Sequence, residues 1–325
     1  MTGTEGNQVT NFSHEIVNFS NLPDELLMDI FSRFSFDDLC RCARVCRRWH
    51  ALCKCIDMKR QIIIHQVLPQ PKFLQLIEHH FSIYLEDFRI LPSTRPSCAN
   101  FMPITGKQLL EINSHCSLKI LILKYCCLDV VTLVHFPLSL DHLSIRGCNM
   151  DSAKFFGLDP SLFLPHLVSL DIGYVKNYLT SDELFRLNSL KTLKALYMEG
   201  CLRINSGGIE SIHKLLPRLE ILDVEGTDIS NEGAIFIMNN CPKMKKLFLG
   251  HTQIDDRVFD AADKKLMPDL DYFCVIDSKI TAIGLQNFFK DFDSLSVLTV
   301  KAFPKVSSNF EFRIAAFDVY LYRWK

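Results

Sequence analysis

A hydrophobic sequence motif, which we call the phrase, recurs along most of this 325-residue chain. Its clearest copy, residues 140–150, places Leu, Leu, Ile, Cys and Met at the first, fourth, sixth, ninth and eleventh positions. Further copies begin at Leu118, Leu167, Leu193, Leu219, Met244, Leu270 and Leu295. Successive starts lie 22, 27, 26, 26, 25, 26 and 25 residues apart. Copies that keep phase in this way describe a repeated structural unit rather than a chance match.

The period is that of leucine-rich repeats. Within a copy, alternating residues such as Leu143 and Ile145 point inward from a short strand. Parallel neighbouring strands need a crossover, and segments such as 206–216 are suited to a short helix. One repeat cannot bury its own apolar face, so stability must come from stacking. The sequence therefore predicts an α/β solenoid with parallel strands on the concave side and helices on the convex side.

The ninth position of the repeat carries small side chains, which can meet the loop backbone at the turn without leaving a large void. Its occupants are Cys126, Cys148, Cys201, Thr227, Thr252 and Ser278. Residues 85–90 resemble a degenerate first repeat, separated from the next copy by a loop rich in proline. The aromatic tail 310–325 matches no repeat, and we expect it to cap the solenoid end.

A helical block precedes the repeats. Residues 1–18 are polar and unpatterned, which predicts a disordered N-terminal segment. Pro23 suits the first turn of a helix with Leu26, Leu27, Ile30 and Phe31 on one face. We expect the helical domain to span 19–66, a linker helix to span 67–83, and the repeat domain with its cap to span 84–325.

Bulk composition excludes several classes. The net charge of −1 and pI near 6.8 remove any bulk electrostatic argument for nucleic acid or anionic membrane. No run approaches the ~18–20 apolar residues of a membrane span, and the N-terminus lacks the pattern of a secretory signal. The 13 cysteines are an odd number in a long chain, which favours reduced thiols and a cytoplasmic or nuclear location.

One segment carries a specific motif. Residues 22–31 read LPDELLMDIF, followed by Leu39 and by VCRRW at 45–49. This series resembles the F-box, which reads LP-x-E-L-x-x-x-I-F, then a leucine, then V-C-x-x-W. An F-box placed before leucine-rich repeats is similar to the F-box/leucine-rich-repeat family, and the resemblance covers residues 20–303. The family often carries an aromatic residue shortly after the motif, where this chain has MKRQIII at 58–64.

The resemblance implies an adaptor that docks onto the Skp adaptor of a cullin–RING ubiquitin ligase and holds a protein substrate for ubiquitination. The positions that match the F-box motif are Leu22, Pro23, Leu26, Ile30, Phe31, Leu39, Val45, Cys46 and Trp49. A domain this small buries little of its surface alone, which makes an exposed apolar helix face reasonable as an interface. The alternative is that Leu26, Ile30 and Phe31 pack only within the local helices.

The middle repeats carry acidic residues at the fifth and seventh positions, which face the concave side. They are accompanied there by two aromatic residues: the set is Asp171, Tyr197, Glu199, Asp223, Glu225 and Phe248. Like charges on neighbouring strands, ~5 Å apart, cost on the order of 1 kcal/mol in an exposed setting. A substrate segment bearing Lys or Arg would relieve that repulsion; the alternative is an ordinary solvated strand face with nearby lysines. A phosphate reader is less expected because Lys124, Arg146 and Lys301 are scattered in the sequence.

Searches for catalytic patterns find no Walker loop, GxSxG elbow or HExxH helix. Cys46 and Cys53 lack a second ligand pair, so we expect neither a metal nor a cofactor. The interpretation is a non-catalytic substrate-recognition subunit. A repeat scaffold with no ligase role is the second hypothesis, and co-purification with the adaptor and a cullin would separate the two. An enzyme is disfavoured by the missing site.

Overall fold

The computed structural model describes residues 19–34, 36–55, 60–81, 83–97, 100–175, 179–261, 264–289, 297–301 and 318–322. The chain divides into two compact units, Met1–Met58 and Lys59–Lys325. The expected disordered segment 1–18 lies outside the described residues, as does most of the expected cap 310–325.

The first unit contains three α-helices, α1 (Asp24–Phe31), α2 (Phe36–Cys42) and α3 (Arg47–Cys55), after a 3-10 turn at Phe19–Asn21. Its core is small. Leu27 and Phe31 of α1 are buried together with Leu52 of α3. The ring of Trp49 packs edge-on against Phe31, with 4.9 Å between the centroids.

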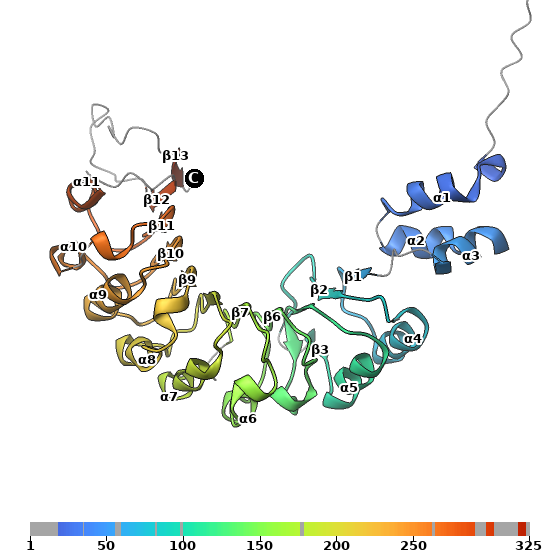
Figure 1. Ribbon diagram of the computed structural model, residues 1–325, viewed down its shortest axis with the longest axis horizontal. Helices are drawn as coiled ribbons and strands as arrows, with labels where there is room; N and C mark the ends of the chain where they lie inside the picture. Colours follow the sequence, from blue (N-terminus) through green and yellow to red (C-terminus); the bar gives the residue numbers. More distant parts are fainter. Residues whose placement is uncertain are drawn as a thin grey trace, which may run out of the picture. The chain divides into compact units, whose positions relative to one another are not determined.

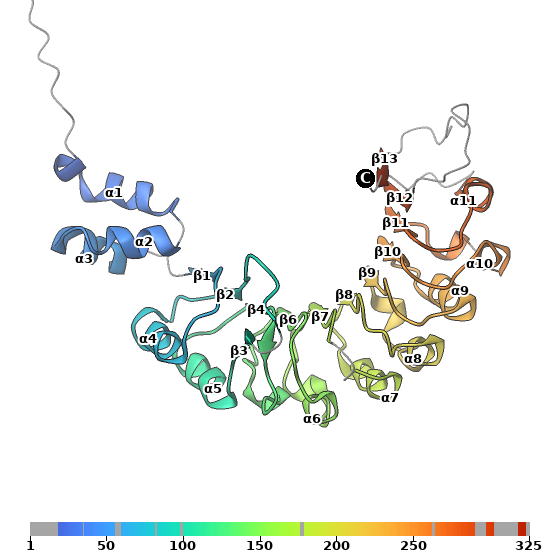
Figure 2. The ribbon, with the colours of Figure 1, turned by 180° about the vertical axis from the view of Figure 1, so that it is seen from behind.

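The second unit is built on an 11-stranded parallel sheet (Figures 1 and 2). Its strands, in sheet order, are β1 (Gln61–Ile64), β2 (Asp87–Ile90), β4 (Ile120–Leu123), β6 (His142–Ser144), β7 (Ser169–Asp171), β8 (Ala195–Tyr197), β9 (Ile221–Asp223), β10 (Lys246–Phe248), β11 (Tyr272–Cys274), β12 (Val297–Lys301) and β13 (Asp318–Tyr322). A second small sheet pairs β3 (Met102–Pro103) with β5 (Cys126–Cys127).

Helices connect the strands and follow the outer side of the arc, while the large sheet follows its inner side (Figures 1 and 2). The α-helices are α4 (Gln70–His80), α5 (Gly106–His115), α6 (Ser152–Phe155), α7 (Ser181–Leu184), α8 (Ser206–Ser211), α9 (Asn231–Asn240), α10 (Arg257–Ala261) and α11 (Ala282–Phe289). Shorter 3-10 turns occur at Leu133–His135, Pro160–Leu162, Phe185–Ser189, Leu216–Arg218 and Lys264–Leu266. The predicted solenoid, with strands on its concave side and helices on its convex side, is confirmed.

The fourth position of the repeat forms the spine of the core. Leu143 of β6 pairs in register with Leu121 of β4 and Leu170 of β7, and the same ladder continues through Leu196 and Leu222. Each of these side chains is at most 2% exposed. Because side chains alternate across a strand, the residues at the third and fifth positions of each repeat lie on the opposite, concave face.

Two positions after each strand shape the turn. In the seven copies that begin at Leu118 through Leu270, the eighth position has a left-handed backbone, with φ between 52° and 70°: Tyr125, Gly147, Tyr174, Gly200, Gly226, His251 and Asp277. At the ninth position the small side chains bond to strand carbonyls, as in Thr227 Oγ1 to Val224 (2.6 Å) and Cys148 Sγ to Leu123 (3.0 Å). A small polar group therefore satisfies backbone that the turn leaves unpaired.

The boundary between units differs from the expected one. β1 pairs in parallel with β2, so the sheet already begins at Gln61, inside the segment 19–66 expected to be helical. α4 is correspondingly the helix between two strands of the solenoid rather than a linker helix over 67–83. Strand β1 is short and precedes the recognisable phrase, which is why the repeat pattern missed it. At the other end, β13 extends the sheet beyond β12.

No helix in the described parts of the chain combines the length and apolar character that a membrane crossing requires.

Candidate functional site

Helix α1 carries two apolar stripes, each with i, i+4 spacing. Leu27 and Phe31 form the inner stripe and are at most 1% exposed. Leu26 and Ile30, continued by Leu22 just before the helix, form the outer stripe; Leu26 is 51% exposed, whereas Leu22 and Ile30 are partly buried against the core. Adjacent positions on a helix point about 100° apart, so one helix cannot bury both stripes in a bundle of three. Leu26 is therefore the residue of the outer stripe that this bundle leaves uncovered.

The structure divides the motif residues into three groups. Phe31 is fully buried and holds the bundle together, which agrees with the alternative of local packing for that one residue. Leu22, Ile30, Leu39 and Trp49 pack against the core but remain partly accessible. Pro23, Leu26, Val45 and Cys46 are exposed, with Val45 at 62%.

An ion pair ties the start of α1 to α3. The Arg48 guanidinium lies 2.6 Å from the Asp24 carboxylate and also donates to the carbonyl of Leu22 at 2.5 Å. Arg48 is thus a structural residue as well as a member of the motif's basic segment. Because Leu22 precedes α1, this clamp orients the residues at the start of the outer stripe.

The acidic cluster on the concave face consists of Asp171, Glu199, Asp223 and Glu225. Backbone register places Asp171 beside Tyr197, and Tyr197 beside Asp223. Carboxylate oxygens of Glu199, Asp223 and Glu225 approach within 4.8 Å of one another. The structure thus brings together the acidic residues that the repeat columns predicted.

Arg146 compensates part of this negative charge. Its guanidinium is 3.4 Å from the Asp171 carboxylate and also forms an ion pair with Glu199. To reach Glu199, two strands away in the sheet, the side chain passes over Gly173, where a Cβ atom would lie 2.7 Å from the Arg146 Nη1 atom. Arg146 therefore relieves part of the repulsion at Asp171 and Glu199 from within the chain itself.

The pairing of Arg146 with the acidic cluster was not predicted, because Lys124, Arg146 and Lys301 are scattered in the sequence. A signal was present in the seventh position, where glycine at 173 stands between Arg146 and Glu199.

Further contacts reinforce the cluster. Tyr174 donates its hydroxyl to Glu199 at 2.6 Å, which is the main reason that the pKa of Tyr174 is raised to about 12.

Among the described residues, Asp223 and Glu225 form no ion pair with a lysine or arginine. Burial, together with the negative charges of Glu225 and Glu199, raises the pKa of Asp223 from 3.8 to about 7. Burial also raises the pKa of Glu225, whose carboxylate accepts a hydrogen bond from the Cys274 thiol at 2.8 Å. A cation placed beside these two groups would favour their charged forms.

The two predicted aromatic residues lie on either side of Asp223. Tyr197 is half-buried, and burial followed by the charges of Asp171 and Asp223 raises its pKa. Phe248 pairs in register with Asp223 on the next strand, and its ring is 4.8 Å from that of Tyr272. The acidic cluster is therefore bordered by an aromatic surface on β10 and β11.

Within the described ranges, Glu199, Asp223 and Glu225 are also the group of His, Cys, Asp and Glu side chains close enough to share a metal ion. Their oxygens would suit a hard cation. The Arg146 guanidinium, however, already supplies a positive charge at Glu199. The same carboxylates would equally accept the ammonium or guanidinium group of another protein.

A family model supports the reading of the first unit. The model described as F-box-like matches residues 19–65. This range covers the three helices α1 to α3 and the whole motif, from Leu22 to Trp49.

Curated proteins resemble a longer part of the chain. The human protein named F-box/LRR-repeat protein 12 is 24% identical over 220 residues, which cover 67% of this chain and 67% of that protein. A putative F-box protein of Arabidopsis thaliana is 23% identical over 238 residues, which cover 71% of each chain. Among solved structures, the yeast Rad7 and Elc1 complex matches with 14% identity and a TM-score of 0.45, over 91% of this chain and 92% of that one.

Proposed function

We propose that this chain, which matches an F-box-like family model over residues 19–65 and is similar to F-box/leucine-rich-repeat proteins, is a non-catalytic substrate-recognition subunit of a Skp–cullin–F-box ubiquitin ligase. The outer stripe of α1 docks onto a Skp adaptor, and the concave face of the solenoid holds a protein substrate. Its contribution is proximity, since tethering turns an encounter between substrate and ubiquitin-loaded enzyme into an effectively intramolecular one. We place it in the cytoplasm or nucleus.

The observation that carries this proposal is the exposed Leu26 beside the buried Leu27. A helix that served only its own bundle would place polar residues on its outer stripe. An exposed leucine, with Val45 also exposed, is instead what an apolar interface with a partner requires. Residues whose side chains are already buried, Phe31 above all, act by holding this surface in place.

Docking is tested by capture of a purified Skp adaptor on the full-length chain. Leu26→Asp combined with Val45→Asp should reduce capture at least ~100-fold, because two charges would be buried at the interface. Leu162→Asp, at a leucine that is 66% exposed in the solenoid, is the matched control and should leave capture unchanged. Equal capture by both variants would refute docking through this surface.

Substrate capture is tested on the acidic cluster. We expect Glu199→Lys with Glu225→Lys to abolish substrate capture and to leave adaptor capture intact. Because Glu199 is paired with Arg146, reversal at that position also disturbs an internal contact. Glu225→Lys alone is therefore the cleaner variant, and Glu232→Lys, on exposed helix α9 surface, is its control. Proteins that remain bound after Glu225→Lys do not use the acidic cluster.

The scaffold hypothesis makes the opposite prediction for the ligase. A scaffold would retain partners on its concave face, yet bring down neither the adaptor nor a cullin from cells. Loss of both proteins from the Leu26→Asp/Val45→Asp variant, with substrate retained, supports the ligase role.

A further inference from the structure

The seventh position of the repeat forms an ordered series of charges along the concave face. In sheet order its residues are Lys124, Arg146, Gly173, Glu199, Glu225, Gly250 and Ile276. Two bases are followed by a glycine, two acids, a second glycine and an apolar residue. Neighbouring members lie about one strand spacing, ~4.8 Å, apart.

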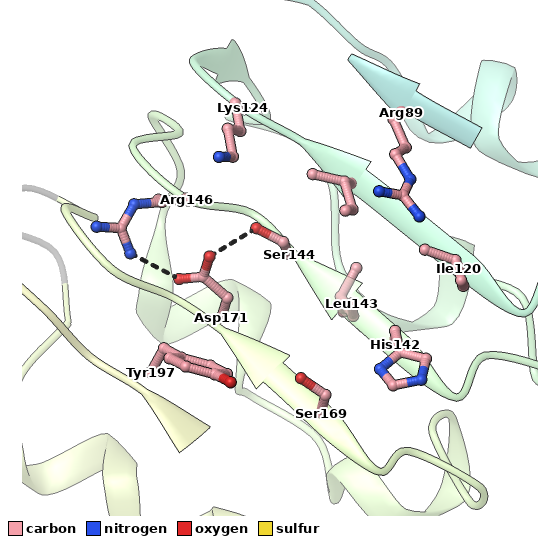
Figure 3. A pocket seen from close by; sticks show the side chains of 11 residues that line it. Arg89, Ile120, Lys124, His142, Leu143, Ser144, Arg146, Ser169, Asp171 and Tyr197 are labelled. Atoms are coloured by element: carbon pink, nitrogen blue, oxygen red, sulfur yellow. Dashed lines mark hydrogen bonds and ion pairs between the residues drawn. The ribbon is translucent and has the colours of Figure 1, made fainter. Parts of the chain in front are cut away.

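The basic end of the series borders a hollow of about 650 Å³. Figure 3 shows Lys124, Arg146 and Ser144 at the ends of neighbouring strands, around this hollow, with Arg89 on the far side. Arg89 is neutralised by Asp87, with 2.7 Å between their closest atoms, and Arg146 by Asp171 and Glu199. Among the described residues, no carboxylate lies within ion-pair distance of Lys124. Lys124 is thus the base that a ligand can engage.

The acidic end has a matching property. Glu199 is satisfied by Arg146 and by the Tyr174 hydroxyl. Glu225 forms no ion pair with a lysine or arginine of the described chain; its contact is the Cys274 thiol. The internal pair between Arg146 and Glu199 therefore joins the middle of the series and leaves one unpaired charge at each end.

Backbone hydrogen bonds limit how a ligand can bind this face. The groups that follow the strands bond to the next repeat, as in Ile145 N to Asp171 O (2.9 Å) and Met198 N to Asp223 O (2.8 Å). A peptide lying on the face cannot add a strand there and must be read through side chains. Charge complementarity then sets its orientation.

We propose that the concave face reads an extended substrate segment in which an anionic group and a basic side chain lie about six residues apart. Four strand steps separate Lys124 from Glu225, or ~19 Å, and an extended chain advances ~3.3 Å per residue. The anionic group, a carboxylate or a phosphate, contacts Lys124 in the hollow, and the basic side chain contacts Glu225. This inference deepens the proposed substrate role and rests on it.

The test uses the full-length chain and fluorescein-labelled glycine–serine peptides that carry one phosphoserine and one arginine. We expect a separation of about six residues to bind at least ~3-fold more tightly than separations of about two or ten, and added salt to weaken all of them. A parallel series with glutamate in place of phosphoserine distinguishes the sources of the anionic group. A phosphate site binds the first series preferentially, and a carboxylate site binds both alike. Equal affinity at every separation would overturn the proposal.

Charge reversal assigns the two ends. Lys124→Glu should remove the gain from the anionic residue, and Lys124→Gln should remove most of it while keeping a polar, uncharged side chain. The double variant Lys124→Glu/Glu225→Lys should prefer the opposite order of charges along the peptide. Lys107→Glu, on exposed helix α5 surface, is the matched control. If Lys124→Glu binds like Lys107→Glu, the basic end is not a binding site.

Adaptor capture is measured on the same variants. A preference for spacing that persists while the chain captures no adaptor would refute the ligase role alone. Absence of any spacing preference in the unsubstituted chain, with its adaptor capture intact, would refute this inference alone.

Discussion

The two units of this chain solve the burial of apolar residues in opposite ways. The helical unit has a core of Leu27, Phe31 and Leu52 and leaves a second apolar stripe on its surface. The solenoid buries its repeated leucines almost completely and places its charged residues on the open sheet face. A small bundle has too little interior for all of its motif residues, whereas each repeat gains a neighbour on both sides. Under the proposed function, apolar recognition and charged recognition thus fall on different units.

The largest expected effect is a loss of stability of the solenoid when one of its buried leucines is shortened. Leu222→Ala removes a side chain that is 0% exposed between two stacked strands. We expect the free energy of unfolding of the solenoid to fall by about 3 kcal/mol, from lost burial and a residual cavity. Urea denaturation followed by circular dichroism measures it. Leu202→Ala, at a leucine that is 70% exposed, should change it by less than ~0.5 kcal/mol.

A smaller effect concerns the acidic cluster on the concave face of the solenoid. The folded-state pKa of Asp223 is about 7, above its ordinary 3.8, so the folded chain holds this proton more tightly than the unfolded chain. The resulting stabilisation is complete below pH 3.8 and is lost as the pH rises through 7. Asp223→Asn should therefore stabilise the protein by on the order of 2 kcal/mol at pH 8 and by less at pH 5.

Thermal unfolding at the two pH values checks this prediction. A stabilisation by Asp223→Asn that is equal at pH 5 and pH 8 would contradict it. The affinity for a basic peptide should depend on pH in the opposite direction to the stability of the protein. Affinity should rise as the pH increases through 7, because a cation prefers the ionised carboxylate.

A third prediction concerns the left-handed backbone at the turn of each repeat. Gly226 has a φ of 61°, and a Cβ atom there would meet only ordinary contacts, the nearest at 3.6 Å. Gly226→Ala should cost about 1 kcal/mol, entirely from the left-handed backbone. Gly207→Ala, in helix α8, where a Cβ atom would lie 3.4 Å from Asn205 Oδ1 as its nearest contact, should instead stabilise by ~0.5–1 kcal/mol. Chemical denaturation of the pair measures both, and effects of the same sign would contradict the assignment.

The smallest stability effect tests the helical unit with two adjacent leucines. Leu26→Ala changes a side chain that is 51% exposed and should alter unfolding by less than ~0.5 kcal/mol. Leu27→Ala changes one that is 0% exposed and should unfold the three helices. Circular dichroism and limited proteolysis of the helical unit distinguish the outcomes. A large loss of stability from Leu26→Ala would mean that the outer stripe is part of the core.

Much of the fold was predictable because the phrase repeats with a constant period. The period identified the strands from Ile120 onward, and the column at the fifth position was confirmed by backbone register. It could not identify β1 at Gln61–Ile64, which lies before any full copy of the phrase. The left-handed eighth position also escaped notice, although glycine at 147, 200 and 226 was a visible signal.

The sequence by itself determined which side chains face inward and which lie on the concave face, because side-chain direction follows from periods of two and of about 25 residues. Only the tertiary structure decided how those side chains are paired. Arg146 reaches Glu199 by crossing Gly173, and the contact exists only once three repeats are stacked. Likewise, only packing decided that Leu27 is covered and Leu26 is open, since both are equally apolar in the sequence.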